Sequence, residues 1–179
     1  MKNSCVHTIG RLYRRPYFVN ERSSKMTFNP TLKVQALSKR EASKLTPPDR
    51  ALLISIQDGE KSHLPFKQRT NHITRDKYIA TLFTYFDDVQ EDLNPFAFGI
   101  NDARQIINFL NRHFQKPGNF DRIIVHCQAG VSRSQAVALF IAKYYYDDEN
   151  LYKQLLNQEG KVPGGNRHVY ELLEKTFKK

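Results

Sequence analysis

The sequence has little cysteine and no long apolar run. Only Cys5 and Cys127 occur among 179 residues, which is too few for a disulfide framework. No apolar run approaches the roughly 20 residues that cross a bilayer, and the first residues, MKNSCVHTIGRLYRRPYF, lack an apolar segment followed by a cleavage site. These absences predict a cytoplasmic protein without membrane insertion. In such a chain, a lone interior cysteine is a candidate nucleophile.

Acidic residues are outnumbered by basic ones, which gives a formal net charge of +10. A basic surface attracts nucleic acid, anionic membranes or acidic phosphorylated substrates by the same long-range physics, and composition does not separate these partners. Much of the excess lies near the two ends of the chain, where charge is usually solvated. Residues 1–26 also lack regular periodicity. We predict a basic extension at 1–26 and one globular domain at 27–179.

Apolar runs and amphipathic segments alternate along residues 27–179. Three runs rich in branched and aromatic residues are typical of strands covered on both faces, and a shorter strand precedes them; they are 32–38, 51–57, 78–86 and 122–127. The polar segment between Glu60 and Lys77 is interpreted as a connecting loop. Strands that alternate with helices predict an α/β fold, a single layered domain with a central, mostly parallel sheet flanked by helices.

Capping residues and periodicity predict the helices. Ser38 followed by Glu41 is a capping-box pattern that opens a helix through Leu45. Apolar residues at three-and-four spacing indicate an amphipathic helix from Ile100 to Phe114. Two further helices are predicted, a buried one within 136–146 and a final one that Asn166 caps.

The run HCQAGVSRS, from His126 to Ser134, carries the predicted chemistry. Cys127 ends the strand RIIVHC, and Arg133 follows after five residues, where the chain enters the buried helix. Backbone N–H groups of such a loop and the positive helix N-terminus can surround one phosphate. Arg133 can bind two phosphoryl oxygens through its planar fork, and the same positive field favours the thiolate form of Cys127. The predicted phosphate-binding residues are Gln128, Ala129, Gly130, Val131, Ser132 and Arg133.

This run resembles the signature of the cysteine-dependent protein-tyrosine-phosphatase superfamily, and it is most similar to the dual-specificity phosphatase branch. The resemblance implies that Cys127 attacks phosphorus to form a cysteinyl-phosphate intermediate, while Arg133 holds the transferring group. It also implies that His126 orders the loop and that Ser134 hydrogen-bonds the sulfur to ease its departure. The fold that it implies is protein-tyrosine-phosphatase-like, with neither cofactor nor metal.

A general acid must protonate the leaving oxygen, and the resemblance places it at the end of the preceding strand. The acidic run DDVQEDLNP, from Asp87 to Pro95, follows the predicted strand 78–86. It contains three candidates, Asp87, Asp88 and Asp92. Asp88 matches the acid position of small dual-specificity enzymes and is the predicted catalytic acid. A solvated acidic loop is the alternative.

The residues leave more than one function open. The leading hypothesis is a protein phosphatase for phosphotyrosine, with phosphoserine and phosphothreonine as further substrates, so its partner would be a phosphorylated protein or peptide. RNA 5′-phosphatase activity is the alternative, because the chain is basic. It is not favoured, since RNA-directed relatives tend to carry Asn where Ser132 stands. A non-catalytic phosphate-binding module is a third hypothesis.

Overall fold

A computed structural model describes residues 33–45, 50–65, 67–68, 77–90, 94–116, 118–158 and 160–179. The predicted extension at 1–26 lies outside the described residues. The strands are β1 (Lys33–Ser38), β2 (Ala51–Gln57), β3 (Ala80–Tyr85) and β4 (Arg122–Cys127). They form one sheet in the order β1-β4-β2-β3, and every neighbouring pair is parallel. The predicted α/β fold with a parallel central sheet is confirmed.

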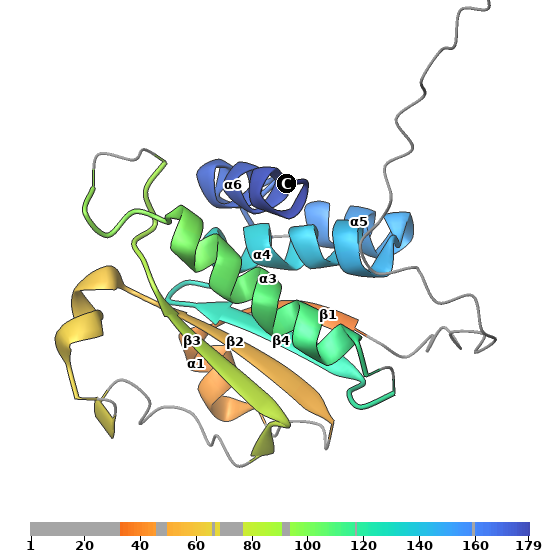
Figure 1. Ribbon diagram of the computed structural model, residues 1–179, viewed down its shortest axis with the longest axis horizontal. Coiled ribbons are helices and arrows are strands. Elements are labelled where there is room, and N and C mark those ends of the chain that lie inside the picture. Colours follow the sequence, from red (N-terminus) through yellow and green to blue (C-terminus); the bar gives the residue numbers. More distant parts are fainter. Residues whose placement is uncertain are drawn as a thin grey trace, which may run out of the picture.

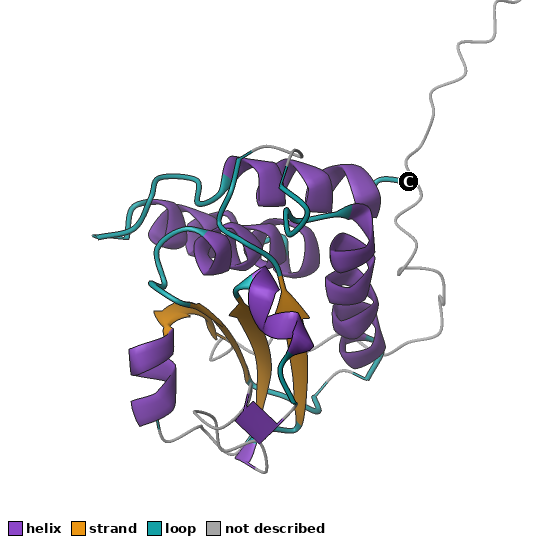
Figure 2. Ribbon diagram, turned by 90° about the vertical axis from the view of Figure 1, so that its left-hand side faces the viewer, coloured by secondary structure: helices purple, strands orange, loops and turns teal. Residues whose placement is uncertain are grey.

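Helices cover both faces of this sheet (Figure 1). Helices α3 (Ile100–Phe114) and α4 (Arg133–Ile141) lie on one face, and α6 (Arg167–Phe177) packs against both of them. The short α1 (Lys39–Lys44) lies on the other face against β1 and β4. A view turned by 90° shows the same unequal layers (Figure 2). None of the helices in the described ranges has the length and apolarity that crossing a membrane requires.

Burial on both faces explains the continuous apolar runs of the strands. All seven residues of β2 are buried, and its five apolar residues alternate between two clusters. Ile54 belongs to the main core under α3, α4 and α6, whereas Leu53 belongs to a smaller cluster with Ile124 of β4. Because burial of each such side chain contributes roughly 2 kcal/mol, both faces of β2 hold it at the centre of the sheet.

The helix termini follow the predicted caps. At α1, the Ser38 side chain accepts a hydrogen bond from the Glu41 N–H, and the Glu41 side chain accepts one from Ser38, so the capping box is confirmed. At α6, the Asn166 side chain accepts from the Val169 N–H at 3.1 Å, as the sequence predicted. These caps satisfy N–H groups that have no partner inside a helix.

Three further elements differ from the sequence prediction. A 3₁₀ helix, η1 (Gly59–His63), overlaps the start of the segment that was predicted to be a loop, Glu60 to Lys77. The buried helix continues as a π-helical turn, η3 (Ala142–Tyr146). Helix α5 (Glu149–Leu156) was not predicted; it begins where the Asp148 side chain accepts from the Leu151 N–H. Leu155 is the one buried residue of this short helix, and Leu151, Tyr152 and Leu156 also pack against the core.

The parallel sheet brings the ends of distant strands to one edge. Asp58 follows β2, Phe86 and Asp88 follow β3, and Cys127 ends β4. In parallel sheets the carboxyl ends of all strands lie on the same side, and ligands bind there. The candidate site is built at this edge.

Candidate active site

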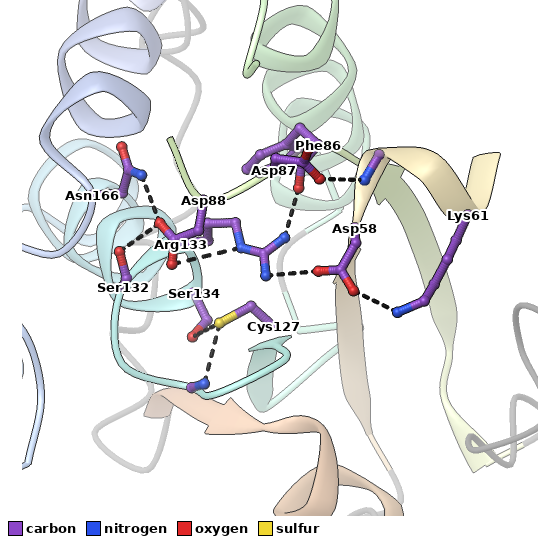
Figure 3. A network of polar contacts seen from close by, with 12 residues as sticks. Asp58, Lys61, Phe86, Asp87, Asp88, Cys127, Ser132, Arg133, Ser134 and Asn166 are labelled. Carbon is purple, nitrogen blue, oxygen red and sulfur yellow. Dashed lines mark hydrogen bonds and ion pairs between the residues drawn. The ribbon is translucent and has the colours of Figure 1, made fainter. Parts of the chain in front are cut away.

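Cys127 lies at the base of the loop that joins β4 to α4 (Figure 3). Its side chain is buried. The Gly130 N–H donates to Cys127 Sγ at 3.2 Å, and Ser134 Oγ lies 3.3 Å from the same sulfur. Helix α4 begins at Arg133, so the positive end of its dipole also faces the loop. The Gly130 N–H and the positive end of the helix dipole therefore both face the sulfur.

The carbonyl groups of this loop are hydrogen-bonded to segments outside it. Because a trans peptide is planar, each carbonyl and the N–H of the next residue point in opposite directions. The N–H groups of residues 129, 131, 132 and 133 therefore face away from these outer segments, where they can bind one anion. The outer contacts are Lys39 N to Gln128 O (3.2 Å), Lys161 Nζ to Gly130 O (2.7 Å), Val162 N to Val131 O (2.9 Å) and Asn166 N to Ser132 O (3.1 Å).

Gly130 is required by the tight path of the loop. Its φ is +77°, a left-handed conformation that side chains disfavour. A Cβ at this position would lie 2.3 Å from the Ser38 backbone nitrogen and 2.5 Å from the Leu37 carbonyl carbon. The loop thus packs directly on the junction of β1 and α1, which leaves no room for a larger residue.

Arg133 is buried, and two of its three guanidinium nitrogens are fixed by the protein. Nη1 donates to the Phe86 carbonyl oxygen at 2.6 Å, and Nη2 donates to Asp58 Oδ1 at 3.0 Å (Figure 3). Its Nε is buried without a hydrogen-bond partner among the described residues. A buried donor of this kind costs free energy until an acceptor is supplied. A phosphoryl oxygen would supply that acceptor.

Asp58 holds Arg133 from the end of β2, and the sequence analysis missed it. The carboxylate also accepts from Lys61 Nζ at 2.5 Å. Partial burial favours the neutral form of Asp58, but hydrogen bonds from Lys61 and Arg133 outweigh it and lower the pKa of the carboxyl. Asp58 is therefore ionised at neutral pH and pairs with Arg133. Its position directly after a predicted parallel strand was the available signal.

Of the three predicted acid candidates, Asp88 lies beside the loop. Its Oδ1 accepts from Ser132 Oγ and from Asn166 Nδ2, both at 2.7 Å, and its Oδ2 lies 3.9 Å from Arg133 Nε. The Asp87 Oδ1 instead accepts from the Gly59 N–H at 2.8 Å, which fastens the end of β3 to η1. Asp92 lies outside the described residues.

The structure thus brings predicted site residues to the same edge in two sets of contacts: Cys127 contacts Ser134, and Arg133 lies beside Asp88 (Figure 3). His126 is buried one position earlier on β4, and Gln128 and Ala129 are exposed on the loop. The roles of these side chains stay predictions.

Among the described residues, no three His, Cys, Asp or Glu side chains are grouped as metal ligands would be, so this part of the chain offers no candidate metal centre.

The proteins to which this chain is similar are described as phosphatase-like. Residues 100–171 match the family model described as the Rit1 DUSP-like domain. The matched residues include α3, β4 and the loop after β4, and they make up less than half of the chain. No curated protein matches this sequence.

Solved structures similar to this chain are also phosphatase-like. A human tyrosine phosphatase-like serine/threonine/tyrosine-interacting protein is 17% identical over 77% of this chain and 86% of its own, with a TM-score of 0.48. The PTP-2 phosphatase of Cydia pomonella is 20% identical over 69% of this chain and 70% of its own, with a TM-score of 0.45. A putative phosphatase from Shewanella putrefaciens CN-32 is 15% identical over 83% of this chain and 87% of its own, with a TM-score of 0.47. The chain resembles protein-tyrosine-phosphatase-like proteins, as the sequence predicted.

Proposed function

We propose that this chain hydrolyses phosphotyrosine in proteins, with phosphoserine and phosphothreonine as further substrates, through a cysteinyl-phosphate intermediate. One observation carries the proposal. A buried cysteine sulfur receives a backbone N–H inside a loop that ends at Arg133, and Arg133 keeps a buried Nε without an acceptor in the described structure. A phosphoryl group bound there would satisfy Nε and the loop N–H groups together.

The proposed reaction has two steps. In the first, Cys127 Sγ forms a bond to phosphorus while the ester P–O bond breaks, and Asp88 gives its proton to the departing oxygen. In the second, water attacks phosphorus and the S–P bond breaks, with Asp88 now accepting the proton from that water. Ser134 Oγ, 3.3 Å from Sγ, can donate a hydrogen bond to the sulfur as it leaves. Arg133 holds the transferring group in both steps.

A second candidate is a phosphate carried by RNA. The name of the model that matches residues 100–171, Init_tRNA_PT, refers to a tRNA, and the formal net charge of +10 suits a nucleic acid partner. The loop chemistry is the same for both substrate classes, because it contacts only the phosphoryl group. The two candidates therefore differ in what surrounds the loop.

A substrate panel tests the proposed function. We expect kcat/KM to be highest for a phosphotyrosyl peptide, measured beside a phosphothreonyl peptide, an RNA with a 5′-triphosphate and its 5′-monophosphate form. Raising the salt concentration provides a control, because binding to RNA weakens steeply with salt and binding to a short peptide weakens less. Preference for either RNA would assign the second candidate, and turnover of none would refute phosphatase activity.

Asp88→Asn should slow the first step in a way that depends on the leaving group. The amide keeps the size of the side chain but has no proton to give, so kcat for a phosphotyrosyl peptide should fall by about 10²- to 10⁴-fold. An aryl phosphate with a strongly acidic phenol needs less protonation, so its deficit should be much smaller.

Asp87→Asn is the matched control for this variant. Its carboxylate binds the Gly59 N–H away from the loop, so its loss should change stability more than leaving-group dependence. Asp92→Asn completes the set. If either control variant, rather than Asp88→Asn, showed the leaving-group effect, the acid would be misassigned.

A further inference from the structure

The segment 161–166, between α5 and α6, holds the outer side of the loop. Three consecutive loop carbonyls, those of residues 130, 131 and 132, each accept a hydrogen bond from it. Gly165 lets this segment approach: a Cβ there would lie 2.4 Å from the Ala136 nitrogen and 2.9 Å from the Ser132 oxygen. The segment is therefore fitted to the loop at backbone distance.

Asn166 ends this segment and joins three parts of the molecule. Asn166 is fully buried. Its N–H donates to the Ser132 carbonyl, its Oδ1 accepts from Val169 as the cap of α6, and its Nδ2 donates to Asp88 Oδ1 at 2.7 Å and to the Val89 carbonyl at 3.1 Å. Figure 3 shows the amide directed at Asp88.

Helix capping decides which end of the amide faces Asp88. The Val169 N–H is a donor, so it requires the amide oxygen. The NH₂ group must then point the other way, where it can only donate. The α6 cap thus presents a fixed donor to the Asp88 carboxyl group.

Because of this donor, the two carboxyl oxygens of Asp88 differ in the hydrogen bonds that they accept. Oδ1 accepts from both Ser132 Oγ and Asn166 Nδ2, whereas Oδ2 faces Arg133 Nε at 3.9 Å. A carboxyl oxygen that already accepts two hydrogen bonds is poorly placed to carry a proton. Oδ2 is the oxygen left to carry the proton toward the leaving group.

We propose that Asn166 is a positioning residue that fixes the Asp88 carboxyl group over the loop with Oδ2 directed to the substrate. The inference rests on the proposed function, in which Asp88 is the acid. Because the Asn166 N–H binds Ser132 while its amide binds Asp88, the acid is placed relative to the phosphate-binding loop as well as to β3.

Two substitutions separate this role from capping. Asn166→Ser and Asn166→Asp both keep a good N-cap. Serine is too short to reach Asp88, and aspartate replaces the donor with a carboxylate that repels it. For phenyl phosphate, whose phenol has a pKa of about 10, we expect kcat to fall by roughly 10- to 100-fold in both variants, with KM little changed. Turnover of an aryl phosphate with a strongly acidic phenol should stay near the wild-type rate.

Asp148→Ala is the control for a lost cap, because Asp148 caps α5 away from Asp88. This variant should have a lower melting temperature, and the ratio of its kcat for phenyl phosphate to its kcat for the ester of the strongly acidic phenol should be unchanged. Equal slowing of both esters by the Asn166 variants, or slowing of neither, would overturn the inference while the proposed function stands. If the wild-type protein hydrolysed neither ester, the proposed function itself would fail and the inference with it.

Discussion

Cys127→Ser should abolish turnover of every phosphate monoester while the fold persists. The sulfur contacts the Gly130 N–H at 3.2 Å and Ser134 Oγ at 3.3 Å, and a hydroxyl in its place can make the same two contacts. A serine hydroxyl is, however, a much weaker nucleophile than a cysteine sulfur, and the proposed covalent step requires the sulfur. We expect kcat to fall to background and the melting temperature to change little.

Binding distinguishes a lost nucleophile from a damaged site. The loop N–H groups and Arg133 remain in this variant, so calorimetry should give a Kd for a phosphotyrosyl peptide similar to the wild-type KM. Cys5→Ser, the other cysteine of the chain, is the matched control and should be fully active. Activity above a trace in Cys127→Ser, or a wild-type enzyme that resists vanadate, would rule out covalent catalysis. Binding without turnover in the wild type would favour the phosphate-binding module.

The local parts of the fold and site were predictable from sequence. Strand β2 matches its apolar run from Ala51 to Gln57, and α3 matches its period from Ile100 to Phe114. The loop was predictable for the same reason, since Cys127 and Arg133 are separated by only five residues between a strand and a helix. Each of these signals is contained in one short segment.

The parts that were not predicted depend on strand order and packing. Asp58 meets Arg133 from 75 residues away and Asn166 meets Asp88 from 78. Sequence indicated parallel strands but not the order β1-β4-β2-β3, which places the ends of β2 and β3 beside the loop. Asn166 was predicted as a cap, but the partner of its free NH₂ group follows only from how α6 packs. Tertiary contacts of this kind leave no periodic trace in the chain.

Arg133→Lys should be nearly as damaging as loss of the nucleophile, although it keeps the charge. The guanidinium uses Nη1 for the Phe86 carbonyl and Nη2 for Asp58, and it keeps Nε for the substrate. A lysine has one nitrogen on a flexible stem, so it cannot hold both strand ends and a phosphoryl oxygen at once. We expect kcat/KM to fall on the order of 10³-fold, with losses in both kcat and substrate affinity.

Arg167→Lys provides the matched control. Arg167 is exposed at the start of α6 and pairs with Glu171 at 2.7 Å, so the same substitution there should leave kinetics unchanged. A loss of only a few-fold in Arg133→Lys would show that a point charge suffices and that the planar fork has no special role. A large loss confined to KM would show that Arg133 binds the ground state and the transition state equally well. Parallel losses in kcat and affinity are the result that the geometry predicts, because Asp58 and Phe86 fix the guanidinium before the phosphoryl group arrives.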